Sequence, residues 1–341
     1  MTLLTEIPVI QAPMAGAQGS VLAIAVSNAD GLGSLPCGML TPQAIRAELS
    51  TIAAATGKPY NVNFFVHREP AVDDAREAAW RAILAPYYRE LGADPSAIPA
   101  QAGRTRFDED TAAVLEAFRP PVVSFHFGLP AAGLLRRVKG WGSRVIASAT
   151  TIDEARHLEA QGVDAIIAQG LEAGGHRGMF LTEDLSTQMG TFALVRQLVQ
   201  AVRVPVIAAG GIADAAGVRA ALALGASAVQ VGTAYLSCPE ATTSAVHRAA
   251  LKAPGSDLTA LTNLFTGRPA RGLLNRLMRE IGPMNAAAPA FPLASGAITP
   301  LRAKAEAKGS GDFTGMWAGQ HIRRGTDLPA AQLTRELGGL A

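Results

Sequence analysis

Short apolar runs that end in glycine or in a polar residue recur along this chain of 341 residues. Continuous runs of this kind are typical of strands that are buried on both faces, as in a parallel sheet. Between most of them lie helical patterns, for example at 151–162 and 214–225, which open with a Thr or an Asp that can cap a helix and close on glycine. The strand candidates are residues 7–14, 31–37, 60–66, 121–128, 144–150, 164–170, 204–211 and 227–233.

Eight strand candidates with intervening helices predict an α/β fold, and within that class a (β/α)8 TIM barrel with a smaller helical domain. A doubly wound open sheet is the alternative, although no G-x-G-x-x-G follows any strand candidate. We assign residues 1–66 and 121–250 to the barrel and 67–120 to a helical insertion near its mouth. Residues 251–341 are expected to form a C-terminal segment that partly covers the mouth. Simple packing is the alternative role for both additions.

The composition mainly excludes classes of function and partner. With 49% hydrophobic and 17% charged residues the chain reads as a soluble protein with a large core. Its net charge of +2 and its lack of a Lys/Arg cluster argue against a nucleic-acid partner. Cys37 and Cys238 provide no metal-ligand cluster, so no metal is expected. The N-terminus lacks the pattern of a signal peptide, and glycines interrupt the apolar run 220–239, so we expect a cytoplasmic protein that does not enter a membrane.

A glycine-rich segment that contains a His and an Arg, "LEAGGHRG" (171–178), directly follows the sixth strand candidate. The active site of a (β/α)8 enzyme lies at the carboxyl ends of the strands. Glycine lets the backbone pass close to a ligand, and the charge of a His changes near neutral pH. His176 is therefore a candidate catalytic residue, with a purely structural His as the alternative. For Arg177 and Glu172 a salt bridge within the loop is the alternative to a role in the site.

Two further glycine motifs close the last two strand candidates: "AAGGIAD" (208–214) and "QVGTAYL" (230–236). Backbone N–H groups that glycine leaves accessible at a helix N-terminus bind phosphate without a positive side chain. Barrels of this class hold phosphate after strands seven and eight, so the pair indicates a phosphate site. Tight turns in a crowded barrel are the alternative.

The other strand ends supply Met14, Asn63, His126 and Gln169. Asn63 and Gln169 lie among apolar neighbours, where an unpaired amide costs about 1–3 kcal/mol. A bound heterocycle with carbonyl and N–H edges would give these amides partners. Hydrogen bonds to nearby backbone are the alternative.

With these residues assembled, the chain resembles the nitronate monooxygenases, once called 2-nitropropane dioxygenases. The resemblance runs over nearly the whole chain, through "QAPMAG" (11–16), "NVNFF" (61–65), "SFHFG" (124–128), "AQGLEAGGHRG" (168–178), "AAGGI" (208–212), "QVGTAYL" (230–236) and "WAGQ" (317–320). It implies a barrel that binds FMN non-covalently. Asn63, Gln169 and Gly174 would line the flavin, while Gly211 and the run Gln230, Val231, Gly232 and Thr233 would hold its phosphate and ribityl side.

The resemblance also implies a reaction and roles for two histidines. His176 corresponds to the catalytic base, and His126 to a second active-site histidine that we assign to substrate binding. The reaction is oxidative denitrification of alkyl nitronates, such as propionate 3-nitronate, with O2, through a flavosemiquinone, to a carbonyl compound and nitrite. Related enzymes often place tyrosines in the insertion or in the C-terminal part of the pocket. This chain has no Tyr after Tyr235, so the substrate contacts are not carried over.

Two alternatives share the scaffold or part of it. An FMN-dependent enoyl-ACP reductase or NAD(P)H:quinone reductase would use a nicotinamide as reductant, and a similar His occurs in enoyl reductases. A barrel that binds a phosphate ligand without redox chemistry would lack a flavin altogether. The sequence leaves the physiological substrate and the oligomeric state open.

Overall fold

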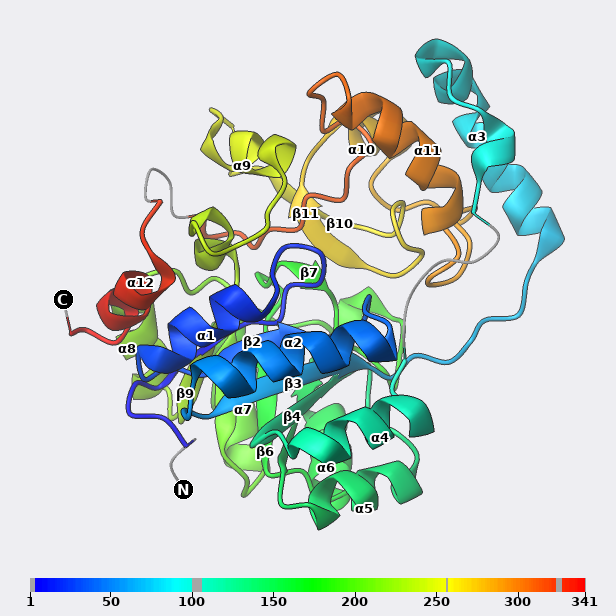
Figure 1. Ribbon diagram of the computed structural model, residues 1–341. Coiled ribbons are helices and arrows are strands. Elements are labelled where there is room, and N and C mark those ends of the chain that lie inside the picture. The colour runs from blue at the N-terminus through cyan, green and yellow to red at the C-terminus, as the bar shows by residue number, and fades with distance from the viewer. Residues whose placement is uncertain (1–3, 100–105, 256, 323–326, 341) are drawn as a thin grey trace.

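A barrel of parallel strands forms the centre of the molecule (Figure 1). The computed structural model describes residues 4–99, 106–255, 257–322 and 327–340. The eight strands are β1 (Val9–Gln11), β2 (Gly33–Pro36), β3 (Tyr60–Phe65), β4 (Val122–His126), β5 (Arg144–Ala149), β6 (Ala165–Gln169), β8 (Val206–Ala209) and β9 (Ala228–Val231). Each lies inside one of the runs that the hydrophobic pattern marked as a strand.

The sheet closes on itself. Its strand order is β1-β9-β8-β6-β5-β4-β3-β2. The two end strands meet through a parallel bridge between Ile10 and Leu32, where the N–H of Gln11 donates to the carbonyl of Leu32 over 3.0 Å. Closure confirms the predicted TIM barrel and shows that the open doubly wound alternative is wrong.

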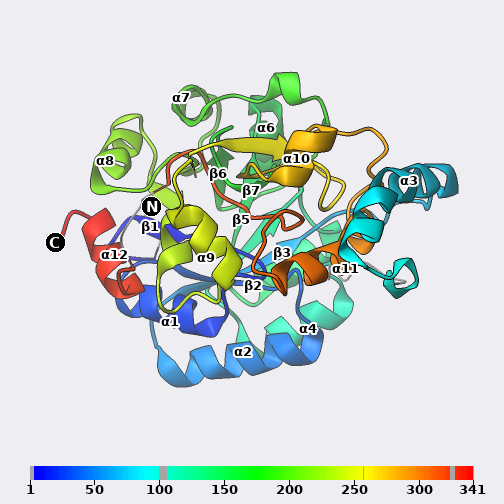
Figure 2. The ribbon, with the colours of Figure 1, turned by 90° about the horizontal axis from the view of Figure 1, so that it is seen from above.

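Helices surround the barrel on all sides in the view from above (Figure 2). Two were expected from their caps: the Thr151 side chain accepts from the N–H of Glu154, and that of Asp214 from the N–H of Gly217. The barrel helices are α1 (Ser20–Asn28), α2 (Pro42–Ala55), α4 (Glu109–Phe118), α5 (Ala132–Gly140), α6 (Ile152–Ala160), α7 (Thr191–Ala201) and α8 (Ala215–Ala223). The C-terminal α12 (Ala330–Leu337) packs against α1 and α8 and so completes the ring.

A second layer, which we call the cap, lies over one end of the barrel (Figure 1). It contains α3 (Asp74–Leu91), α9 (Ala245–Lys252), α10 (Arg276–Ile281), α11 (Ser295–Glu306) and a small antiparallel sheet of β10 (Thr259–Thr262), β11 (Ala270–Leu273) and β7 (Gly175–His176). α3 and α11 share an apolar core of their own around Trp80 and Phe313. α4 and α12 pack with the barrel helices, although they lie in the two segments that we assigned outside the barrel. The domain boundaries expected from the sequence stay a prediction.

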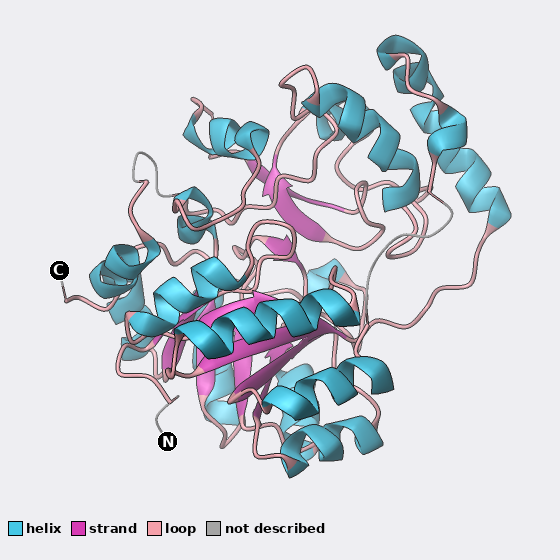
Figure 3. Cartoon of the chain, in the orientation of Figure 1, coloured by secondary structure: helices cyan, strands magenta, loops and turns pink. Residues whose placement is uncertain are grey.

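The cap sheet, drawn in magenta above the barrel strands in Figure 3, joins two distant parts of the chain, because β7 belongs to the glycine-rich loop after β6 and pairs with β11. Inside the barrel, below this layer, a plug of aliphatic side chains fills the lumen: Ile10, Leu32, Val122, Ile146, Ala165, Ile167, Ile207, Ala209 and Ala228. The lumen is therefore packed, and any ligand has to sit between plug and cap. No helix in the described part of the chain is both long and apolar enough to cross a membrane.

The packing of α1 on β2 depends on a glycine, which gives a first prediction. A Cβ added to Gly33 would lie 2.0 Å from the backbone oxygen of Ala23, and backbone cannot move aside cheaply. We expect Gly33→Ala to lower the free energy of unfolding by about 1–3 kcal/mol in urea titrations. Gly57→Ala is the control, since a Cβ there meets nothing within 4 Å. Equal stability of the two variants would contradict this packing.

Candidate active site

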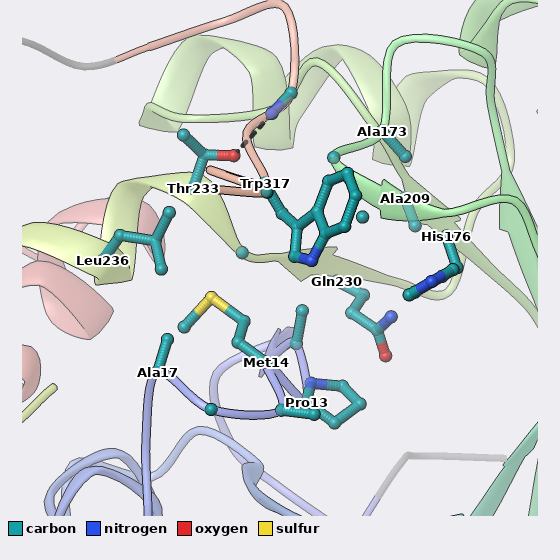
Figure 4. A pocket seen from close by; sticks show the side chains of 18 of the residues that line it. Pro13, Met14, Ala17, Ala173, His176, Ala209, Gln230, Thr233, Leu236 and Trp317 are labelled. Carbon is teal, nitrogen blue, oxygen red and sulfur yellow. Dashed lines mark hydrogen bonds between the residues drawn. The ribbon is translucent and has the colours of Figure 1, made fainter. Parts of the chain in front are cut away.

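A cavity of about 410 Å³ lies between the barrel plug and the cap. Its size falls within the usual range of small-molecule sites. Ile167 and Ala209 of the plug form part of its floor. In Figure 4 the indole of Trp317 faces Met14 and Pro13 across this space, with His176 and Gln230 at one side.

The structure brings almost all of the sequence-predicted residues to this one cavity. Its lining includes Met14, Asn63, His126, Gln169, Gly174, His176, Gly211, Gln230, Gly232 and Thr233. Val231 is the exception, because its side chain is buried in the core between the barrel and its helices. Alternate residues of a strand point to opposite faces, so Gln230 faces the cavity and Val231 faces away from it.

The two glycine motifs form a cradle of backbone donors. Gly211 has a φ of +70°, which favours glycine, and it shares the cavity wall with Gly232. In the described part of the chain no acceptor takes the N–H of either residue. The Oε1 atom of Gln230 is buried beside them and has no hydrogen-bond partner among the residues that the structure describes. A ligand that carries a phosphate and polar side groups would supply these missing partners, so the cradle fits FMN.

The two buried amides differ in how they are used. The Nδ2 of Asn63 donates to the hydroxyl of Ser124 over 2.9 Å, which fixes this side chain against the neighbouring strand β4. The amide of Gln169 instead holds the glycine-rich loop. Its Nε2 donates to the carbonyl of His176 over 2.9 Å, and its Oε1 accepts from the N–H of Gly178 over 2.7 Å. Nearby backbone, the alternative considered for these amides, therefore accounts for much of the hydrogen bonding of Gln169.

His176 lies in β7 and is buried at 8% exposure. Its backbone pairs with Ala270 of β11, so the cap sheet fixes its position. Its Nε2 lies 2.9 Å from the hydroxyl oxygen of Thr266. On the other side, its ring centroid lies 5.4 Å from that of Trp317 and 5.3 Å from that of Phe291. The imidazole thus combines a polar contact to Thr266 with an aromatic wall.

His126, at the end of β4, supports the loop that carries His176. Its Nε2 lies 3.1 Å from the carbonyl of His176 and its Nδ1 lies 3.0 Å from the hydroxyl of Ser148. Because a carbonyl only accepts, Nε2 carries the proton and Nδ1 accepts from Ser148. Burial lowers the pKa of His126 to about 4, which keeps the ring neutral near pH 7. Both ring nitrogens are engaged by protein, although the ring lines the cavity.

Arg177 and Glu172 have separate structural roles. Arg177 is completely buried, and its guanidinium donates over 2.7 Å to the carbonyls of Gly170 and of Gln169. The Glu172 carboxylate accepts from the N–H and the hydroxyl of Thr191, at the start of α7. No ion pair between Arg177 and Glu172 occurs within the described residues. Both side chains therefore shape the loop rather than face the cavity centre.

Several wall residues were not singled out from the sequence. The segment 314–321 crosses the cavity, and the N–H of Gly319 donates to the Thr233 hydroxyl over 2.8 Å (Figure 4). Gly174 has to be glycine there, since an added Cβ would lie 2.6 Å from the backbone of Ala318. Thr266, which contacts His176, and His247 of α9 also had no distinctive local pattern. Only the "WAGQ" motif pointed toward this part of the wall.

Comparison of the chain with known proteins identifies its family. The family model described as nitronate monooxygenase matches residues 1–338. A nitronate monooxygenase of Pseudomonas aeruginosa is 45% identical over 332 residues, covering 97% of this chain and 95% of the relative.

The chain belongs to the nitronate monooxygenase family.

Solved structures agree with this assignment. A nitroalkane oxidase from Streptomyces ansochromogenes superposes with a TM-score of 0.89 at 39% identity, covering 98% of this chain and 96% of the other. FabK from Thermotoga maritima superposes with a TM-score of 0.72 at 28% identity, covering 98% and 92%. The resemblance inferred from the motifs is confirmed. The chain is an oxidoreductase of the nitronate monooxygenase family, which implies a flavin cofactor, a nitronate substrate and O2.

The neutral His126 gives a prediction for pH dependence. Its pKa of about 4 in the folded protein lies below the value of 6.5 expected for an exposed His. As the pH falls, the His126 ring therefore binds a proton in the unfolded chain before it does so in the folded protein. The contribution of neutral His126 to the free energy of unfolding is complete above about pH 6.5 and is lost as the pH falls toward 4. The loss is at most about 3 kcal/mol.

We expect His126→Gln to flatten the dependence of the unfolding free energy on pH between about 6.5 and 4. Some dependence should remain, because burial also lowers the pKa of His247 to about 4. Urea titrations of both proteins across this range provide the measurement. Parallel curves would show that His126 is not held neutral by its surroundings.

Proposed function

We propose that this chain is an FMN-dependent nitronate monooxygenase that converts alkyl nitronates and O2 to a carbonyl compound and nitrite. The observation that carries the proposal is the meeting of two features in one cavity. The unfilled donors of Gly211 and Gly232 suit the phosphate of FMN, and His176 lies on the wall of the same cavity. Family membership supports the reaction, since the family implies a flavin and a nitronate.

The cradle would hold the phosphate through Gly211, Gly232 and Thr233. Met14, Asn63, Gln169, Gly174 and Gln230 would line the rest of the flavin, with Val231 supporting the cradle from behind. When bound, the flavin supplies the redox chemistry by accepting an electron from the nitronate. The chain's own residues bind, orient and shield the reactants.

Thr266 sets the protonation of His176 in this proposal. The Thr266 hydroxyl lies 3.5 Å from the carbonyl of Arg268, to which it donates. Its oxygen then accepts a proton from Nε2 of His176, which lies 2.9 Å away. Nδ1 is consequently the basic nitrogen of the neutral ring. A neutral nitroalkane has to lose its α-proton before it can give up an electron, and Nδ1 of His176 would take that proton.

The aromatic wall would limit water around the reacting carbon. Phe65 and Trp317 line the cavity beside His176, with Phe291 packed against the same imidazole. An apolar wall strengthens hydrogen bonds to the nitro group and slows loss of reactive species to solvent.

Non-covalent FMN is testable by removal. We expect heat precipitation to release FMN into the supernatant, where chromatography identifies it; FAD, or no flavin, would contradict the proposal. Gly211→Asp should abolish FMN retention, because it places bulk and negative charge where a phosphate dianion would lie. Gly142→Asp is the matched control, since Gly142 also has a positive φ, at +92°, and meets nothing within 4 Å.

The role of His176 is testable through the protonation state of the substrate. We expect His176→Asn to lower kcat/KM for neutral nitroethane by about 10²- to 10⁴-fold, the usual contribution of a general base. The loss with preformed ethylnitronate should be smaller, because that substrate needs no proton abstraction. Both rates are measured at equal FMN content. Equal losses on both substrates would show that His176 is not the base.

A further inference from the structure

A second group of polar residues lines the cavity away from the barrel strands. It comes from the cap, with Thr243, Ser244 and His247 at the start of α9, Arg302 and Glu306 on α11, and Thr314 in the crossing segment. None of these residues belongs to the glycine cradle or touches His176 in the contacts described above. We call Thr243 and His247 the cap pair.

The cap pair carries two buried polar atoms that lack partners. Thr243 is 7% exposed and His247 is 8% exposed, and neither Oγ1 of Thr243 nor Nε2 of His247 has a hydrogen-bond partner among the described residues. A buried polar atom without a partner costs about 1–3 kcal/mol. Both residues line a ligand cavity, so a ligand group is a direct explanation of the two vacant positions.

The polar side chains next to the cap pair form hydrogen bonds with other groups. The Ser244 hydroxyl caps α9 by accepting from the N–H of His247, and the Thr314 hydroxyl donates to Glu306 over 2.8 Å. Arg248 donates to backbone carbonyls, among them those of Ser237 and Cys238. Among the described residues of this wall, Thr243 and His247 carry the buried side-chain atoms that lack a hydrogen-bond partner.

The chemistry of the pair selects the kind of group that fits. The His247 ring donates to the backbone carbonyl of Trp317, and since Nε2 is the unpartnered atom, the donor is Nδ1. Burial lowers the pKa of His247 to about 4, so Nε2 is an acceptor near pH 7. The Thr243 hydroxyl can donate. A hydroxyl group satisfies both, donating to Nε2 and accepting from Thr243, whereas a carboxylate cannot donate to Nε2.

Trp317 links the cap pair to the reaction site. Its indole lies 5.4 Å from the imidazole of His176, and its backbone carbonyl binds His247. A substrate that reacts beside His176 can therefore extend along Trp317 toward α9. Arg302, which is exposed, and Glu306 lie one turn apart on α11 and together add no net charge to this wall.

We propose that Thr243 and His247 form a hydroxyl-binding subsite, and that the enzyme prefers nitronates that carry an alcohol group at the end remote from the nitro group. This inference rests on the proposed function, because it extends the substrate of the same site. The alternative source of a hydroxyl is the ribityl chain of the flavin, which the experiment separates.

The test compares 3-nitropropan-1-ol, 1-nitrobutane and 3-nitropropanoate, each as its nitronate, with the FMN-loaded enzyme. We expect kcat/KM for the alcohol to exceed that for the other two by about tenfold or more, because a site built for a hydroxyl rejects an analogue without one. Thr243→Val, which keeps the shape of the side chain, should raise KM for the alcohol and leave 1-nitrobutane unchanged. Thr242→Val, at an exposed neighbouring position outside the cavity wall, is the control.

Four results would overturn the subsite. They are equal kcat/KM for alcohol and alkane, a preference for the carboxylate, an equal effect of Thr243→Val on all three compounds, and weaker FMN binding in Thr243→Val, which would assign the pair to the ribityl chain. If no compound is turned over, the proposed function fails instead. The subsite is then decided by the Kd of 3-nitropropan-1-ol for the anaerobic holoprotein, read from flavin absorbance, which should rise in Thr243→Val if the subsite exists and stay unchanged if it does not.

Discussion

The pairing of β7 with β11 is the contact on which the site depends. A barrel alone presents backbone and short polar side chains at its strand ends, with an aliphatic plug beneath them. The two-residue strand β7 lifts His176 out of the loop after β6 and attaches it to the cap sheet. The cap then supplies Thr266 and Trp317 to the imidazole. The side chain of His176 is thus held between two layers rather than by either one.

The short strand and the loop around it are anchored by side chains. The amide of Gln169 and the Nε2 of His126 bind the carbonyl of His176, and the guanidinium of Arg177 binds the carbonyls of Gln169 and Gly170, where the loop begins. Arg177 is buried, it forms no ion pair with a carboxylate of the described residues, and burial lowers its pKa to about 10. Its charge is stabilised by carbonyls instead, because these accept strong hydrogen bonds from a guanidinium. The motif "AGGHRG" therefore encodes an anchor for the loop, through Arg177, as well as the histidine that we propose as the base.

The barrel and most of the cavity wall could be predicted from the sequence, and the reason is physical. Strands buried on both faces leave continuous apolar runs, and phosphate cradles require glycine, so both leave local marks. Val231 shows the limit of a motif, because alternation along β9 turns its side chain away while Gln230 and Gly232 face the cavity. The contact between Thr266 and His176 spans 90 residues and involves no periodic segment, so local patterns hold no trace of it.

The two layers also divide the chemistry between them. The barrel contributes donors of the backbone, which no substitution other than at glycine easily alters. The cap contributes side chains, including those of Thr243, His247 and Trp317, which are separate from the glycines of the cradle. A flavin held mainly by backbone, as proposed here, would be compatible with many substrates, because affinity for the cofactor and recognition of the substrate would then be separate properties of separate layers. This chain has no tyrosine beyond Tyr235, and the buried polar atoms without a partner on the described cap wall belong to a threonine and a neutral histidine. Under the proposal made above, substrate choice would depend on these two cap residues rather than on the barrel.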